Sequence, residues 1–114
     1  SFILHPSSFI LHPSSFILKH MVIGVCTLTL HIFAAQSLKE KRQVVKSILA
    51  RVRNEFNVSI AEVGGQDTWQ RAELGIACVS TDQGYAHGQL EAVVRFIERI
   101  RPDAPIGGYE IEML

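Results

Sequence analysis

Two amphipathic helical stretches, each with a single apolar stripe, constrain the fold of this chain more than any other feature. The first covers residues 37–56, where Ser37 and Glu40 have the spacing of a capping box at a helix N-terminus. The second covers residues 83 to about 101, and Asp82 is its predicted N-cap. In both stretches the apolar residues recur at helical spacing on one side only. Each helix therefore has one face to bury, so we expect both to pack on the same face of a sheet.

Segments typical of β-strands surround the two helical stretches. They are rich in β-branched residues or alternate between apolar and polar side chains, and they cover residues 21–32, 58–63, 69–80 and 109–114. The resulting order, β-α-β-β-α-β, is that of the ferredoxin-like split β-α-β fold. The sequence therefore predicts an α+β domain over residues 21–114, in which a four-stranded antiparallel sheet carries both helices on one face.

The first twenty residues follow a different pattern. The heptad SFILHPS occurs twice in succession, and a third copy begins at Ser15. Proline in each unit is incompatible with a coiled coil, and the basic start and longer apolar run of a secretory signal are missing. We expect the native protein to start at Met21, with residues 1–20 as a repetitive extension that is disordered or only weakly docked, produced by an upstream repeat or a mis-called start.

Positive charge is concentrated along the first helical stretch. Residues 37–56 contain six basic residues and two acids, a net charge of +4, in a chain whose formal net charge is zero. At about 100° per residue, four cations share one side of the helix beside the apolar stripe, namely Lys39, Arg42, Lys46 and Arg53. Cations in the first turns oppose the helix dipole, at a cost of about 0.3–1 kcal/mol per exposed group. Two explanations stay open: a solvated face balanced by acids elsewhere, or an anion-binding surface for nucleic-acid phosphate.

The sequence gives little support to metal, redox or membrane roles. Cys26 and Cys78 lie in apolar strand-like segments, without a Cys-x-x-Cys motif or a Cys/His cluster at metal-ligand spacing. We therefore expect buried, reduced thiols, no metal and no cofactor. No apolar run approaches the roughly 18 residues of a membrane span, so no membrane partner is predicted.

One predicted hairpin gathers side chains of the kinds that enzymes use. They are Asp67, Trp69, Gln70 and Arg71. A structural explanation is stronger, in which Trp69 covers an edge of the core and Asp67 pairs with Arg71. No nucleophile–base pair or set of paired carboxylates stands out. We therefore predict no catalytic residues and expect that the protein is not an enzyme.

Three segments within residues 37–82 give the chain a close resemblance to a known family. They are residues 37–42 (SLKEKR), 56–63 (FNVSIAEV) and 67–72 (DTWQRA). From Met21 to its end the chain resembles the YlxP-like bacterial family, a small domain of unknown function. The resemblance implies a ferredoxin-like fold and a cytoplasmic bacterial protein. Genes of this family typically sit among transcription-termination, translation-initiation and ribosome-maturation genes, which implies contact with RNA or the ribosome. The resemblance supplies no catalytic residues.

Our first hypothesis is a non-catalytic binding protein associated with RNA or the ribosome. Its nucleic-acid-binding candidates are Lys39, Lys41, Arg42, Lys46, Arg53 and Arg71. The exposed sheet face carries no aromatic ring at the positions where RNA-binding sheets stack bases. Binding through the helix would therefore depend on phosphate contacts, and we expect it to be salt-sensitive and weakly sequence-specific.

The alternative is a homo-oligomeric protein-interaction module without nucleic-acid binding. The sheet face opposite the helices carries small and apolar side chains, and such a patch is typical of a protein contact. The interface candidates are Ile23, Val25, Thr27, Ala77 and Val79. This hypothesis predicts a homodimer or a higher assembly that buries this face.

Overall fold

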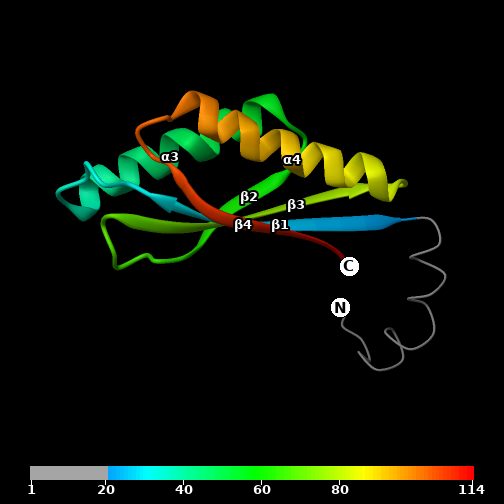
Figure 1. Cartoon of the computed structure of the whole chain (residues 1–114), viewed down its shortest axis with the longest axis horizontal. Helices are drawn as coiled ribbons and strands as arrows, with labels where there is room; N and C mark the ends of the chain where they lie inside the picture. The colour runs from blue at the N-terminus through cyan, green and yellow to red at the C-terminus, as the bar shows by residue number, and fades with distance from the viewer. Residues whose placement is uncertain (1–20) are drawn as a thin grey trace, which may run out of the picture.

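One antiparallel sheet with two helices on one face forms the part of the protein that the structure describes. The computed structural model describes residues 21–114, so the expectation for residues 1–20 lies outside the described residues. The elements are β1 (Val22–His31), α3 (Leu38–Glu55), β2 (Ser59–Gly64), β3 (Arg71–Ser80), α4 (Gln83–Ile100) and β4 (Ile106–Met113). The strand order is β2-β3-β1-β4, and Figure 1 shows both helices above the sheet. The predicted ferredoxin-like fold is confirmed.

Strict alternation along the two central strands separates a core face from an outer face. Cys26, Leu28 and Leu30 of β1 are buried, and their neighbours Thr27 and Thr29 lie on the opposite face. The buried residues of β3 have the same two-residue period, and they are Ala72, Leu74, Ile76 and Cys78. We name the opposite side, which neither α3 nor α4 covers, the outer sheet face.

The two helices cover different parts of the sheet. α4 packs on β1, β3 and β4, whereas α3 contacts β2 and α4. The two helices meet where Phe56 and Phe96 make an edge-to-face ring contact at 5.3 Å. α3 therefore lies over the edge of the sheet formed by β2, and one side of α3 is left open to solvent.

Both predicted helix N-caps are present. The Ser37 hydroxyl accepts a hydrogen bond from the Glu40 amide at 3.1 Å, and the Asp82 carboxylate accepts one from the Tyr85 amide at 2.7 Å. The Glu40 carboxylate accepts from the amide of Gln36 at 2.8 Å, one residue before the position expected in a capping box.

Two strand boundaries differ from the prediction by more than one residue. β3 begins at Arg71 and not at residue 69, and the turn before it contains Gly65, whose φ of 76° lies in the left-handed region that favours glycine. β4 begins at Ile106 and not at residue 109. A Cβ at position 107 would collide with the His31 ring. Glycine has no Cβ, so Gly107 allows β4 to pair closely with β1 at this point.

Among the described residues, no helix combines the length and the hydropathy that crossing a membrane requires.

Candidate nucleic-acid interface

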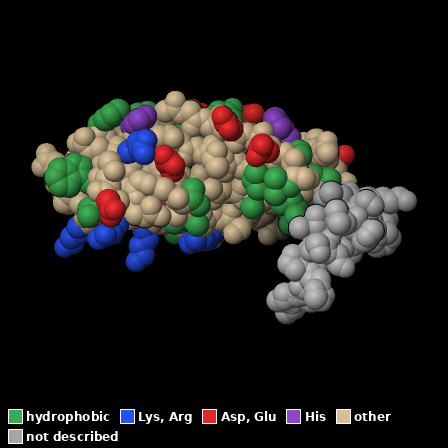
Figure 2. All heavy atoms as spheres, turned by 90° about the horizontal axis from the view of Figure 1, so that it is seen from below, with side chains coloured by type: hydrophobic (Ala, Val, Ile, Leu, Met, Phe, Trp, Pro, Cys, Tyr) green, Lys and Arg blue, Asp and Glu red, His purple; other side chains and the backbone are tan. Residues whose placement is uncertain are grey.

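Four cations occupy the open side of α3, and we name them together the basic flank. They are Lys39, Arg42, Lys46 and Arg53, and all four side chains are exposed. The Arg53 guanidinium donates a hydrogen bond to the carbonyl of Ile60 in β2 at 2.8 Å, which places this end of the flank at the β2 edge. At 1.5 Å per residue the flank extends for about 21 Å. Figure 2 shows Lys and Arg side chains gathered along one long edge of the protein.

None of the basic flank residues forms an ion pair within residues 21–114. The ion pairs of this part of the chain use the side chains of Lys41, Arg71, His87, Arg95 and Arg101. Within the described residues, ion pairs therefore do not balance these four cations, although Lys41 of the same helix pairs with Glu62. The hydrogen bond from Arg53 to a carbonyl leaves its positive charge uncompensated.

Lys41 was predicted as a nucleic-acid contact, and the structure contradicts this prediction. Lys41 is 0% exposed, and its Nζ lies 2.5 Å from a carboxylate oxygen of Glu62 and 2.6 Å from the carbonyl oxygen of Gly65. The spacing could have revealed this, since Lys41 precedes Val45 by four residues and continues the apolar stripe of α3. The positive charge of Lys41 is therefore paired with a carboxylate inside the domain.

Arg71 also differs from the basic flank. Its guanidinium lies 3.2 Å from the carboxylate of Glu73, and it does not make the predicted pair with Asp67. Both side chains are largely exposed, and a pair of this kind contributes about 0–1 kcal/mol. Arg71 is the cross-strand partner of His31, which places it at one end of the outer sheet face.

The remaining side chains of the predicted hairpin have structural or surface positions. The Gln70 amide donates to the carbonyls of Phe33 and Ala35 at 3.2 and 3.3 Å, and so it holds the β1–α3 connection. Trp69 is 48% exposed, so the prediction that it covers an edge of the core is wrong.

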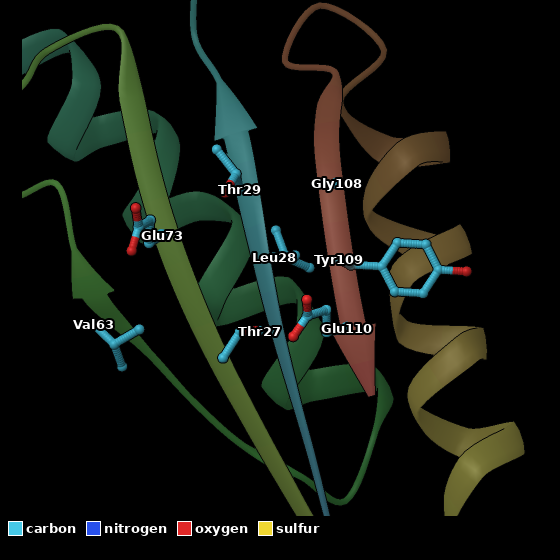
Figure 3. A pocket seen from close by; sticks show the side chains of 8 residues that line it. All are labelled: Thr27, Leu28, Thr29, Val63, Glu73, Gly108, Tyr109 and Glu110. Atoms are coloured by element: carbon cyan, nitrogen blue, oxygen red, sulfur yellow. The ribbon is translucent and has the colours of Figure 1, made fainter. Parts of the chain in front are cut away.

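The five interface candidates all lie on the outer sheet face. Val79 is 65% exposed, Thr27 is exposed, and Ile23, Val25 and Ala77 are partly buried. Ile23, Val25, Ala77 and Val79 form a mainly apolar half of this face, and Thr27 lies at its border with the other half. The other half contains a shallow, more polar hollow, and Figure 3 shows the residues that line it, among them Thr27, Thr29, Val63, Glu73 and Glu110. Sequence reasoning did not identify this hollow, because its walls come from all four strands.

The two thiols lie in the core, away from these surfaces. Burial, and secondarily the charge of Glu91, raises the pKa of Cys26 to about 11, and burial also raises the pKa of Cys78. Both are free cysteines, and at neutral pH Cys26 is a protonated thiol without nucleophilic character. The described part of the chain brings together no group of three or more His, Cys, Asp or Glu side chains that could hold a metal ion.

Comparison with known proteins identifies relatives of unknown function. Residues 23–110 match the model of a family described as "Protein of unknown function (DUF503)". The chain is 51% identical over 77 residues to the uncharacterized protein YlxP of Bacillus subtilis (strain 168), an alignment that covers 68% of this chain and 84% of YlxP.

Solved structures show similarity of fold alone. The YXEP protein of Bacillus subtilis, a dinuclear metal binding peptidase of the M20 family, has a TM-score of 0.52 at 11% identity, with 82% of this chain and 26% of that chain covered. A hydantoinase/carbamoylase family amidase from Burkholderia ambifaria has a TM-score of 0.51 at 9% identity, with 84% and 28% covered. A de novo designed protein with ferredoxin fold has a TM-score of 0.48 at 21% identity, with 80% and 84% covered. At these identities the similarity says nothing about chemistry.

Proposed function

The chain belongs to DUF503, a family of proteins of unknown function, and we propose that it is a non-catalytic cytoplasmic protein that binds RNA, either free or in the ribosome. The single observation that supports this proposal is the basic flank of α3. Its four cations are exposed, share one side of a helix and have no carboxylate partner within residues 21–114. A row of this kind attracts a polyanion and gains affinity by releasing the counterions of its phosphates.

The position of the basic flank on α3 also favours an anionic ligand. Lys39 and Arg42 lie near the N-terminus of α3, where the helix dipole disfavours positive charge. A bound phosphate would offset this repulsion, whereas solvent only screens it. Lys41, which lies between them in sequence, has its own carboxylate and does not need an external anion.

The expected mode of binding is led by phosphate contacts. Cations on a helix flank position a nucleic-acid backbone without reading its sequence. We therefore expect weak sequence specificity and strong salt dependence.

Crosslinking to RNA in cells tests this proposal. The test variant carries Lys39→Glu, Arg42→Glu and Lys46→Glu, and the matched control carries Arg51→Glu, Arg95→Glu and Arg99→Glu, three exposed cations outside the flank. Both variants change the net charge equally. We expect the flank variant to recover much less RNA than the unaltered protein, and the control to recover a similar amount. Equal recovery by both variants would contradict the proposal.

A second candidate function is self-association through the outer sheet face. The exposure of Val79 beside Val25 and Ala77 favours it, because contiguous apolar patches usually mark contacts. The register places Val25 directly opposite Ala77 on neighbouring strands, so these side chains form one continuous surface. This surface and the basic flank are distinct, and one protein can use both.

Val79→Glu is expected to convert a homodimer into a monomer, because it would bury a carboxylate in an apolar contact. Sedimentation velocity at micromolar concentration measures the change. Gln83→Glu, which adds the same charge on the exposed surface of α4, is the control and should leave the assembly unchanged. If the unaltered protein already sediments as a monomer, this second function is wrong.

A further inference from the structure

We propose that Phe33 and Trp69, at the end of the outer sheet face next to the β2–β3 turn, form a stacking site for unpaired RNA bases. This inference rests on the proposed function and narrows its ligand to single-stranded RNA. The two rings lie just beyond the ends of β1 and β3, so they are absent from the central strand positions at which RNA-binding sheets present aromatic residues.

Phe33 already takes part in a stack that is open on one side. Its ring lies parallel to the ring of His31, with 5.2 Å between centroids and an interplanar angle of 1°. The Phe33 side chain is nevertheless 64% exposed. A flat base can therefore continue this stack from the solvent side, and the fold itself holds the first two rings parallel.

The β1–β3 register brings Trp69 to the same end of the sheet as Phe33. His31 pairs with Arg71 at the end of the β1–β3 ladder, and the Ile32 amide then donates to the Gln70 carbonyl at 2.9 Å. Phe33 follows Ile32, and Trp69 precedes Gln70, so each is the next residue beyond this last hydrogen bond. The Gln70 side chain, which donates to the Phe33 carbonyl, holds these two segments together.

The site is next to the start of the basic flank. The buried Nζ of Lys41 binds the carbonyl of Gly65, which joins the first turns of α3 to the β2–β3 turn that carries Trp69. Lys39 and Arg42 are the sequence neighbours of that anchor, and both are exposed. Figure 1 shows the β1–α3 connection and the β2–β3 turn at the same end of the protein. Figure 2 shows the gathered Lys and Arg side chains along the edge toward this end.

The chemistry of these groups selects unpaired nucleic acid. A cationic row that follows the backbone, combined with aromatic rings that receive bases, is the usual composition of single-strand binding sites. In a duplex the faces of the bases are covered by their neighbours, so only the phosphate contacts would remain. Stacking tolerates any base, in agreement with the weak sequence specificity expected of the flank.

Fluorescence and affinity measurements on the full chain test this inference. Trp69 is the single tryptophan of the protein, so a base stacked on it changes the only indole emission. We expect a 12-nucleotide single-stranded RNA of mixed sequence to quench this emission at saturation, and the duplex of the same sequence to leave it nearly unchanged. In anisotropy titrations, Phe33→Leu and Trp69→Leu should each weaken single-strand binding about five- to hundredfold, the range measured for loss of one base–aromatic stack.

Matched controls separate stacking from other effects. Tyr85 is as exposed as Phe33 and lies at the start of α4, so Tyr85→Leu should leave the affinity unchanged. Phe33→Tyr should retain most of the affinity because it keeps the ring. Neither leucine variant should change the salt dependence of binding, because neither removes a phosphate contact.

Three results would overturn the inference, and they are distinguishable. If the flank variant loses affinity while both leucine variants and the Trp69 emission stay constant, RNA binding stands and the stacking site does not. If the leucine variants lower self-association in sedimentation and leave RNA affinity intact, the rings form a contact between copies of the protein. If the unaltered protein binds neither RNA, the stacking site and the proposed function fail together.

Discussion

Replacing Lys41 with methionine is expected to lower the free energy of unfolding by about 3 kcal/mol, because it leaves the carboxylate of Glu62 without its counterion. Lys41 is fully buried and its ammonium bridges Glu62 and the Gly65 carbonyl. Methionine is one heavy atom shorter but keeps an unbranched apolar stem, so little packing is lost. The Glu62 side chain is 19% exposed and can turn partly toward water, which keeps the expected loss at the lower end for a broken buried pair.

Urea unfolding followed by circular dichroism measures this change. Lys46→Met is the matched control, since Lys46 is an exposed cation of the same helix, and it should change the stability by less than about 0.5 kcal/mol. The double variant Lys41→Met with Glu62→Leu should recover most of the loss, because an apolar pair can replace a buried ion pair. Equal stabilities of the Lys41 and Lys46 variants would contradict a structural role for Lys41.

Reversing three charges of the basic flank is expected to have the largest effect on binding. The variant Lys39→Glu, Arg42→Glu and Lys46→Glu should lower the affinity for single-stranded RNA by about a hundredfold or more at low salt, because it removes three phosphate contacts and adds three repulsive charges. The fold should tolerate the change. All three side chains are exposed, and acids near the N-terminus of a helix interact favourably with its dipole.

Anisotropy titration with labelled RNA measures this effect. The control variant, Arg51→Glu, Arg95→Glu and Arg99→Glu, carries the same charge and should retain most of the affinity. A similar loss of affinity in both variants would show that RNA binding depends only on the net charge of the protein. It would contradict a specific role of the basic flank.

The architecture could be predicted because local patterns determine most of it. The alternation of Leu28 and Leu30 with Thr27 and Thr29 assigns the two faces of β1 without knowledge of its neighbours. Asp82 fixes the start of α4 through a bond to an amide only three residues away. Such features depend on residues close in sequence, so the sequence displays them directly.

The errors concern residues whose environment comes from distant parts of the chain. Charge alone predicts that Lys41 is a surface cation, although its spacing places it on the buried stripe, and its partner Glu62 lies 21 residues away in β2. Its apolar ring predicts a place for Trp69 against the core, but Trp69 lies before the start of β3 and is exposed. That Trp69 and Phe33 lie at the same end of the sheet follows from the register of β1 with β3, which no local pattern specifies.

The central claim is that the basic flank contacts phosphates, and the salt dependence of RNA affinity tests it most directly. For a single strand, the slope of log K against log salt concentration is about −0.7 for each phosphate contact. Four flank cations therefore predict a slope of about −3 for the unaltered protein, and the loss of three contacts predicts a slope of about −1 for the flank variant. An affinity that is constant between about 50 and 200 mM salt, or equal slopes for the two proteins, would contradict the claim.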